Sequence, residues 1–239
     1  MTYKKFRELS PVPPIRSMFL CDGLCYKISP YISILCIRYN IRPNTVTLLM
    51  IITGIIAGAT LMLPYVWCKI LSFVLYFIWY TFDLSDGEVA RFTKTFSKGG
   101  KYLDWSAHLV AHPLFAVGMW YSFVCMGFDR MIITIVTFLF IISELLWRNF
   151  IALSSLFNID IGEEVPTQKL EKKSWTRFLY EQFVYLPNEL IIIPLFLGLS
   201  IIFDFVSFYW IYIYWAIFYS FVKIRVFVNF VKKIYLHVG

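Results

Sequence analysis

Residues 43–68 read PNTVTLLMIITGIIAGATLMLPYVWC and contain no Asp, Glu, Lys or Arg. A transmembrane helix needs about 20 mostly apolar residues, so this stretch predicts a helix that crosses a membrane over residues 46–63. We expect Pro64 to end this helix, and Asn44 or Thr45 to cap its first turn. The fold is therefore expected to be built on apolar helices.

The composition of the whole chain agrees with this expectation. Of its 239 residues, 59% are hydrophobic, 20% aromatic and 15% charged, and the mean hydropathy is +0.69. Soluble domains are about 45–50% apolar and about 25% charged. These values exclude a soluble enzyme, a disordered chain and a nucleic-acid-binding module, and the length fits one membrane domain over residues 1–239.

Further apolar runs predict five more membrane spans. They cover residues 66 to beyond 82, 105–128, 131 to about 156, 186–203, and 205 to about 228. With the first span, they predict an all-α bundle of six transmembrane helices over residues 46–231. Within the N-terminal segment 1–45, residues 29–39 are apolar but few and include tyrosines, so we expect them to lie along the membrane interface as an amphipathic segment.

The positions of Lys and Arg predict the orientation of the bundle. Basic residues collect on the cytoplasmic side of membrane proteins, and here the N-terminal segment, two loops and the C-terminal end carry most of them. The opposite side holds little more than Lys69 and Arg130. We therefore expect an integral, multi-pass protein with both termini in the cytoplasm. The net charge of +7 is assigned to orientation and to anionic lipids, and no nucleic-acid partner is expected.

Two other features carry no expected chemistry. The stretch 158–181 mixes acidic and basic residues and predicts a solvated amphipathic connector, with a lid over a substrate as the alternative. Cys21, Cys25 and Cys36 fall on the expected cytoplasmic side, where thiols stay reduced. Because no His or further Cys lies close to them in the sequence, we expect them to be inert.

The densest polar stretch in this apolar chain is DLSDGEVAR at residues 83–91, followed after eight residues by GKYLDWSAH at residues 100–108. Spacings of three and four residues place side chains on one face of a helix. They do so for Asp83, Asp86, Gly87, Ala90 and Arg91 on the second span, and for Gly100, Asp104 and His108 on the third. A short turn joins the two spans, so we expect both faces to meet at the cytoplasmic end of the bundle.

Three aspartates that converge in this way repel one another unless cations neutralise them. Their oxygens suit Mg²⁺ or Mn²⁺ better than Zn²⁺, and a pair of such ions assists the transfer of phosphoryl groups. The small residues leave room for a ligand, and Arg91 offers a guanidinium to a phosphate. A solvated loop would explain the polarity, but not the placement of three aspartates on converging faces.

The pattern resembles that of the CDP-alcohol phosphotransferases, D-x2-D-G-x2-A-R-x8-G-x3-D-x3-D, at seven of its eight fixed positions. The stretch RPNTVT at residues 42–47 and the expected six spans are similar to that family as well. The resemblance implies transfer of a substituted phosphate from CDP-diacylglycerol or a CDP-alcohol to an alcohol hydroxyl. CMP is released, and the product belongs to phospholipid or related lipid synthesis.

The resemblance also implies roles for individual residues. Two divalent metal ions would be held by Asp83, Asp86 and Asp104, with His108 at the fourth position of the metal-binding set. The nucleotide pocket would be shaped by Gly87, Ala90, Arg91 and Gly100. Members of the family are typically homodimers, so a homodimer in contact with membrane lipids is expected.

The sequence departs from the family pattern at its eighth position, where His108 replaces an aspartate. Three interpretations remain open. His108 is the base that deprotonates the acceptor alcohol, or it is a nitrogen ligand that favours Mn²⁺, or the site binds a nucleotide-linked lipid without turning it over. His112 lies one turn further along the same face and is either a relay for protons or a packed, hydrogen-bonded residue.

Glu144 and Arg148 interrupt the fourth span at a spacing of four residues. Charged residues inside a membrane usually pair or face a cavity, so these two residues form an ion pair, or Arg148 binds an anionic group of the acceptor. A small transporter is the rival from another functional class. It predicts charges along a path across the bilayer, whereas the acidic residues here cluster at one end.

Overall fold

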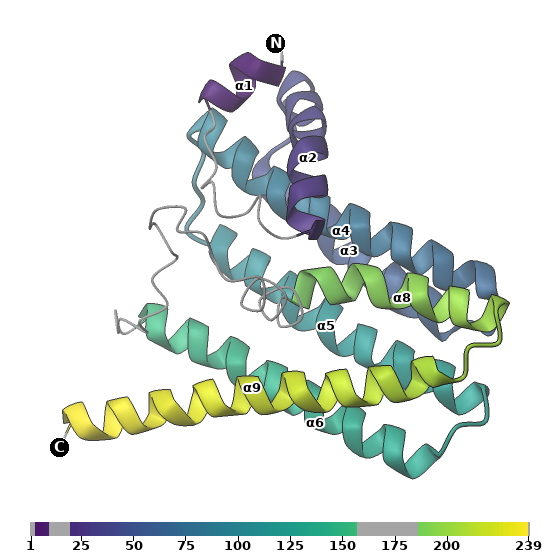
Figure 1. Cartoon of the computed structure of the whole chain (residues 1–239). Coiled ribbons are helices and arrows are strands. Elements are labelled where there is room, and N and C mark those ends of the chain that lie inside the picture. The colour runs from purple at the N-terminus through teal and green to yellow at the C-terminus, as the bar shows by residue number, and fades with distance from the viewer. Residues whose placement is uncertain (1–2, 10–19, 157–185, 239) are drawn as a thin grey trace, which may run out of the picture.

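The structure is a computed structural model that describes residues 3–9, 20–156 and 186–238, and every regular element in these ranges is a helix (Figure 1). The all-α prediction is confirmed. The connector expected over residues 158–181 lies outside the described ranges. The helices are α1 (Tyr3–Leu9), α2 (Leu20–Arg38), α3 (Pro43–Met62), α4 (Val66–Thr93), α5 (Gly100–Cys125), α6 (Arg130–Leu156), α8 (Leu186–Ile202) and α9 (Ser207–Val238).

Five of the described helices are long and apolar enough to cross a membrane, namely α3, α4, α5, α6 and α9. The chain is thus an integral, multi-pass membrane protein. The fifth expected span corresponds to α8, which has 17 residues. At about 1.5 Å per residue this helix is about 26 Å long, somewhat less than a hydrocarbon core of about 30 Å. The other five expected spans each coincide with one of the long helices.

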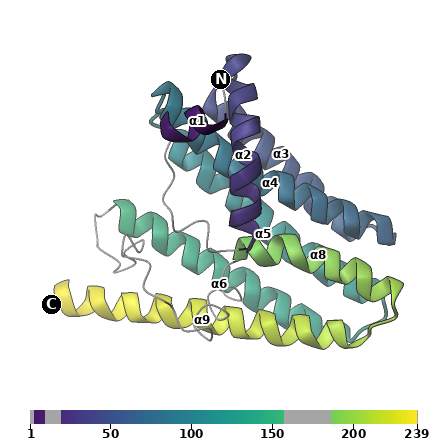
Figure 2. The ribbon, with the colours of Figure 1, turned by 45° about the horizontal axis from the view of Figure 1, so that its top comes forward.

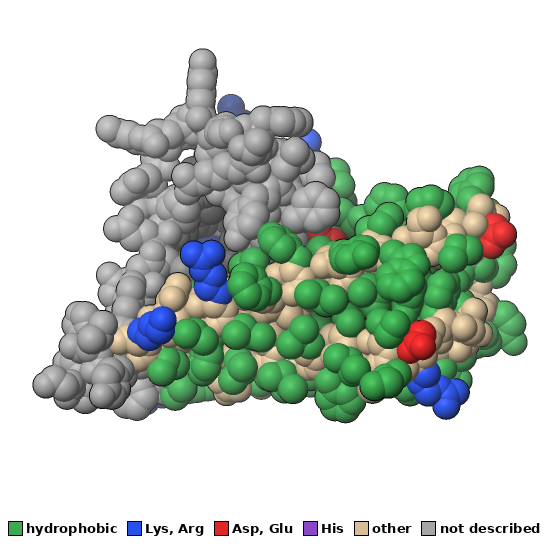
Figure 3. Space-filling model, turned by 60° about the horizontal axis from the view of Figure 1, so that its bottom comes forward, with side chains coloured by type: hydrophobic (Ala, Val, Ile, Leu, Met, Phe, Trp, Pro, Cys, Tyr) green, Lys and Arg blue, Asp and Glu red, His purple; other side chains and the backbone are tan. Residues whose placement is uncertain are grey.

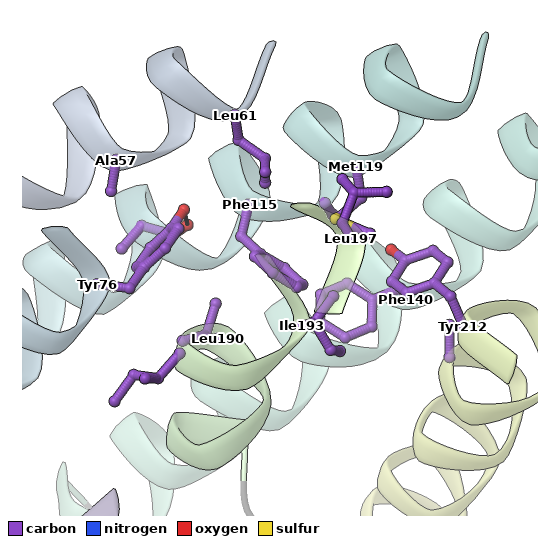
Figure 4. Close-up of a cluster of buried hydrophobic side chains, with 14 of the residues drawn as sticks. Ala57, Leu61, Tyr76, Phe115, Met119, Phe140, Leu190, Ile193, Leu197 and Tyr212 are labelled. Atoms are coloured by element: carbon purple, nitrogen blue, oxygen red, sulfur yellow. Dashed lines mark hydrogen bonds between the residues drawn. The ribbon is translucent and has the colours of Figure 1, made fainter. Parts of the chain in front are cut away.

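The helices form two groups, which the contact of α5 with α6 and the helix α8 connect (Figures 1 and 2). Helices α3, α4 and α5 pack against one another, and α6 and α9 lie side by side. Helix α8 contacts α4 and α9, and α5 contacts α6. A large core holds the groups together, because side chains from α3, α4, α5, α6, α8 and α9 meet in one buried cluster (Figure 4).

Glycines let α3 approach its neighbours closely. A Cβ atom added to Gly58 would lie 2.7 Å from the Cβ of Leu114 on α5, and one added to Gly54 would lie 2.9 Å from the Cδ1 of Trp79 on α4. Small residues at helix contacts are typical of membrane bundles, in which close packing replaces the hydrophobic effect as the driving force. This tight contact fixes α3 next to the two helices that carry the polar motif.

The surface is apolar where it is expected to face lipid. One face of the molecule shows a broad band of hydrophobic side chains, and Lys and Arg side chains stay outside that band (Figure 3). On α3, the residues that point away from the core are large and apolar: Leu48, Leu49, Ile52, Ile55 and Ile56. Lipid tails can cover such a surface without the cost that water would impose.

The start of α3 differs from the sequence expectation. Arg42 is the N-cap residue and makes no side-chain capping bond, whereas Pro43 occupies the first turn. The prediction that Asn44 or Thr45 caps this helix is therefore wrong, because the helix already begins at Pro43, whose fixed φ suits the first helical position. At the other end, the ammonium of Lys69 donates to the carbonyls of Leu61 and Leu63. Lys69 is 2% exposed and lies inside the protein, where its charge stabilises the end of α3.

Helix α2 contains the expected interfacial stretch 29–39 except for its last residue. It is not among the five candidate spans, and it packs against α4. Cys25 and Cys36 are buried on this helix, and burial raises the pKa of the Cys36 thiol. A buried thiol that stays protonated is a poor nucleophile and a poor metal ligand, which agrees with the expectation that these cysteines are inert.

Candidate active site

The last turns of α4 and the first turns of α5 bring Asp83, Asp104 and His108 together. One ligand atom from each of them lies within 4.8 Å of the other two. The Nε2 atom of His108 is 3.3 Å from Oδ1 of Asp83 and 3.7 Å from Oδ1 of Asp104. We name these three residues the acidic cluster. The cluster forms because the chain turns between the two helices. Lys94, in the left-handed conformation, caps the end of α4, and α5 begins at Gly100.

The acidic cluster has the chemistry of a divalent cation site. The Oδ1 atom of Asp104 is buried and has no hydrogen-bond partner, although a buried carboxylate oxygen is costly without one. Two carboxylates and one imidazole within 4.8 Å supply the donor atoms that Mg²⁺ or Mn²⁺ accepts. The residues present therefore fit such an ion.

Asp86 lies outside the acidic cluster but remains close to it. Its Oδ2 atom accepts a hydrogen bond of 2.6 Å from the hydroxyl of Thr47 on α3. Its charge still interacts with those of Asp83 and Asp104. Helix α3 thus contributes to the site through Thr47, a role that the motif on α4 and α5 does not indicate. Thr47 is the last residue of the stretch RPNTVT, whose resemblance to the family assigns no role to any single residue.

The four residues expected to shape a nucleotide pocket lie at the same end of α4 and α5. The guanidinium of exposed Arg91 extends over Gly87, because a Cβ atom on Gly87 would lie 3.0 Å from Nη1 of Arg91. A Cβ atom on Gly100 would lie 2.9 Å from the Ser97 hydroxyl oxygen. The backbone carbonyl of Ala90 accepts the N–H of Lys94 and so helps to end α4.

The second ring nitrogen of His108 faces a line of polar side chains inside the bundle. The Nδ1 atom of His108 is 3.4 Å from Nε2 of His112, and Nδ1 of His112 is 2.7 Å from Oε1 of Glu144 on α6. The side chains of His112 and Glu144 are 0% and 2% exposed. His112 is thus a packed, hydrogen-bonded residue that also touches His108, so both interpretations of it remain compatible with the structure.

Glu144 is the centre of this line. Besides His112, it binds Arg148 at 3.0 Å from Nε to Oε1, and it accepts a hydrogen bond of 2.6 Å from the hydroxyl of Tyr219 on α9. The ion pair between Glu144 and Arg148, one of the two alternatives for these residues, is therefore formed. Arg148 keeps 18% of its side chain exposed, and its Nη2 atom is 3.5 Å from Nδ1 of His108. No sequence signal pointed to Tyr219, because α9 lies far away along the chain.

Trp79 supports both histidines from α4. Its ring packs edge to face with His108 at 5.2 Å and with His112 at 5.8 Å between ring centroids. Trp79 lies four residues before Asp83, so the spacing that groups the aspartates on one face also places Trp79 there. The helical spacing in the sequence therefore indicates that Trp79 lies beside the motif.

Glu88 ties the two N-terminal helices to the motif. It is 1% exposed, and its carboxylate accepts hydrogen bonds from Arg7 on α1 at 2.7 Å and from Ser29 and Ser33 on α2 at 2.8 and 2.6 Å. Glu88 stands within the motif at a position that the family pattern leaves free. Its partner Arg7 could not be predicted from the sequence, since it lies 81 positions away.

Comparison with known proteins identifies the family of this chain. A search of curated proteins found no match to the chain. A comparison with protein families matches residues 40–222 to the family described as CDP-alcohol phosphatidyltransferase. The matched range includes α3 to α6, α8 and the first part of α9, and hence every residue of the acidic cluster. The chain belongs to the CDP-alcohol phosphatidyltransferase family.

Proposed function

We propose that this protein transfers a substituted phosphate group from a CDP-linked donor to an alcohol hydroxyl and releases CMP. Membership of a transferase family supports the reaction class. The single observation that carries the proposal is the acidic cluster, in which two carboxylates and one imidazole converge within 4.8 Å at the junction of α4 and α5. The product is a phospholipid or a related lipid.

In this reaction the acceptor oxygen forms a bond to the donor phosphorus that carries the transferred group. The bond from that phosphorus to the bridging oxygen of the pyrophosphate breaks, and CMP leaves with the electron pair. The proton of the acceptor hydroxyl passes to Nε2 of His108, which lies beside Asp83 and Asp104. Imidazole is well matched to this task near neutral pH.

Asp83, Asp86 and Asp104 are the residues that would hold two Mg²⁺ or Mn²⁺ ions, in line with the use of divalent metals by this family. When bound, the ions neutralise the pyrophosphate and the leaving CMP. Gly87, Ala90, Arg91 and Gly100 would border the nucleotide. A role for His108 as ligand instead of base predicts a preference for Mn²⁺ over Mg²⁺.

Arg148 is proposed to bind an anionic group of the acceptor. Its side chain is 18% exposed, its Nη2 atom lies 3.5 Å from Nδ1 of His108, and its Nε atom is paired with Glu144. The Nε atom of Arg148 is therefore occupied by the ion pair, and the other nitrogen atoms of the guanidinium can donate to a ligand beside His108. The acceptor would then approach the acidic cluster from α6.

The placement in the membrane is also proposed. The turn between α4 and α5 would lie in the cytoplasm, because Arg91 and Lys94 stand at the end of α4 and Lys101 stands at the start of α5. With six spans, both termini would lie on that same side. α8 would be the sixth span, since about 17 residues is the lower limit for a transmembrane helix. The active form would be a homodimer.

The test is a CMP-release assay with the purified full chain in detergent. A panel would pair CDP-diacylglycerol with soluble alcohols, and CDP-choline or CDP-ethanolamine with diacylglycerol, each with Mg²⁺ and with Mn²⁺. We expect release from one pairing, and its loss by at least about 100-fold in Asp104→Asn. Asp129→Asn, at an exposed position far along the chain from the motif, is the matched control.

The variants at His108 and Arg148 separate the finer assignments. His108→Ala is expected to abolish CMP release while donor binding survives, and a fully active variant would contradict its role as base. Arg148→Ala is expected to raise the KM for the acceptor. If no pairing in the panel releases CMP, the proposed transfer is wrong and the protein binds its nucleotide-linked lipid without turnover.

A further inference from the structure

A tyrosine hydroxyl on α9 reaches into the interior of the bundle and contacts α6. We infer that Tyr219 is a positioning residue for the acceptor, because through Glu144 it fixes the direction in which the guanidinium of Arg148 points. Arg148 is the residue proposed to bind an anionic group of the acceptor, so the inference rests on the proposed function. It adds a residue of α9 to a site that is otherwise built from α3, α4, α5 and α6.

The carboxylate of Glu144 is held at both of its oxygens. Oε2 accepts a hydrogen bond of 2.6 Å from the hydroxyl of Tyr219. Oε1 accepts one of 3.0 Å from Nε of Arg148 and lies 2.7 Å from Nδ1 of His112. Glu144 is 2% exposed, so a lost partner leaves a buried oxygen that water does not easily reach. Bonds on both sides keep the carboxylate from turning, and Oε1 therefore stays directed at Arg148.

The ring of Tyr219 is itself fixed in place. It is completely buried, and its centroid lies 5.2 Å from that of Phe140 on α6 and 5.5 Å from that of Trp215. The ammonium of Lys223 lies over the same ring, at 5.3 Å from its centroid. A large side chain that is enclosed in a close-packed interior has little freedom to move. The hydroxyl of Tyr219 is therefore a rigid point to which Glu144 is attached.

The orientation of Arg148 follows from these contacts. A guanidinium is planar and carries its N–H donors in a fixed fork, so a bond from Nε to Glu144 also sets the direction of the two Nη atoms. Nη2 lies 3.5 Å from Nδ1 of His108, and the side chain is 18% exposed. The free end of the fork thus lies beside the acidic cluster. Without this anchor, a ligand would have to restrict the rotamers of a long side chain when it binds.

The sequence of α9 offers a matched control for the Tyr219 hydroxyl. Tyr212 lies two helical turns before Tyr219 and is 1% exposed, and its hydroxyl has no hydrogen-bond partner among the described residues. Tyr219→Phe and Tyr212→Phe each remove one buried hydroxyl from the same helix and keep the ring. The first removes a donor to Glu144, whereas the second removes no hydrogen bond of this kind.

The kinetic test uses the full chain in detergent and the pairing of donor and acceptor that releases CMP. In Tyr219→Phe we expect the KM of the acceptor to rise about 10-fold, with kcat and the KM of the donor nearly unchanged. Tyr212→Phe should leave all three constants unchanged. An acceptor KM in Tyr219→Phe equal to that in Tyr212→Phe would overturn the inference.

A double-mutant cycle separates positioning from a general effect on the fold. If Tyr219 acts through Arg148, then Tyr219→Phe has no further effect on the acceptor KM once Arg148→Ala is present. Equal effects of Tyr219→Phe with and without Arg148 would show that the hydroxyl acts elsewhere. Size-exclusion chromatography and thermal unfolding identify variants that do not fold. If Arg148→Ala is one of them, Arg148→Lys takes its place, since it keeps a cation beside Glu144 but lacks the fork.

A spectroscopic measurement tests the same contact without turnover. With ¹⁵N-labelled arginine, the Nε–H signal of Arg148 is assigned by its loss in Arg148→Lys. We expect this hydrogen to exchange slowly with water in the unmodified protein and in Tyr212→Phe, and faster in Tyr219→Phe. Equal exchange in the two tyrosine variants would overturn the inference, because Tyr219 would then not hold the pair of Glu144 with Arg148.

The exchange measurement and the assay fail independently. Absence of CMP release from every pairing contradicts the proposed transfer, while the exchange at Arg148 still decides whether Tyr219 fixes the guanidinium. Faster exchange in Tyr219→Phe with an unchanged acceptor KM would show that the fixed guanidinium does not serve the acceptor, and the positioning role would be wrong. CMP release with neither change would overturn the inference and leave the transfer intact.

Discussion

Arg7 and Glu88 form an ion pair of 2.7 Å that joins the first helix of the chain to the middle of the motif. The two side chains are 12% and 1% exposed, and the hydroxyls of Ser29 and Ser33 complete the set of donors around the carboxylate. Glu88 is adjacent to Gly87 and two residues from Asp86. The N-terminal helices are therefore attached to the helix end on which the proposed site depends.

Removing this carboxylate should destabilise the protein. Glu88→Ala removes the carboxylate that pairs with the Arg7 guanidinium and accepts from the hydroxyls of Ser29 and Ser33, and breaking a buried ion pair costs about 3–5 kcal/mol. We expect a clear drop in the thermal unfolding temperature of the detergent-solubilised protein, and faster proteolysis within α1. Glu8→Ala, at an exposed position of the same helix, is the control and should leave both unchanged. An unfolding temperature equal to that of the unmodified protein would show that the pair does not hold α1.

The hydrogen bond from Thr47 to Asp86 should matter for metal binding more than for stability. Thr47→Val keeps the shape of the side chain but removes the hydroxyl that lies 2.6 Å from Oδ2 of Asp86. Loss of a group that orients a metal ligand typically costs 10–100-fold in metal affinity or activity, so we expect about that increase in the Mg²⁺ or Mn²⁺ concentration for half-maximal CMP release. Thr45→Val, exposed two residues earlier, is the control. An unchanged metal dependence would mean that Asp86 does not need this contact.

The spacing of the motif predicted a group of four residues, of which Asp83, Asp104 and His108 form the acidic cluster and Asp86 lies outside it. Asp104 and His108 lie one turn apart on α5, and Asp83 lies near the end of α4, so helical periodicity and one short turn bring them together. Such local geometry can be read from sequence because neighbouring turns of one helix fix it. The same reasoning predicted the helices themselves, since uncharged runs of this length have few alternatives in a membrane.

The contacts of Glu144 could not be predicted in the same way. Whether its carboxylate meets His112 on α5 or Tyr219 on α9 depends on how three helices are rotated and shifted against one another, and packing of the whole core sets that. The pair of Glu144 with Arg148 was one of the two alternatives that the sequence offered, because both residues lie within one helix. The partner of Glu88 was not, because the 81 positions between it and Arg7 carry no periodic signal.

The helix boundaries show a further limit. The last span was expected to end near residue 228, yet α9 continues to Val238. Charge in the sequence indicates where a helix leaves the apolar layer, whereas the backbone hydrogen bonds that define the helix can continue into the polar region. For the same reason α4 extends to Thr93 and carries Asp83, Asp86 and Arg91 on its last turns.

The contact between α3 and α5 should be intolerant of added volume at Gly58. A Cβ atom there would lie 2.7 Å from the Cβ of Leu114, closer than side-chain atoms can approach. Gly58→Leu therefore forces α3 away from α5, and overpacking of this kind costs about 1–3 kcal/mol. Because α3 also carries Thr47, CMP release should fall together with the thermal unfolding temperature. Ala59→Leu adds comparable bulk at the next position, which is exposed, and should alter neither quantity. Equal unfolding temperatures for the two variants would contradict the close contact at Gly58.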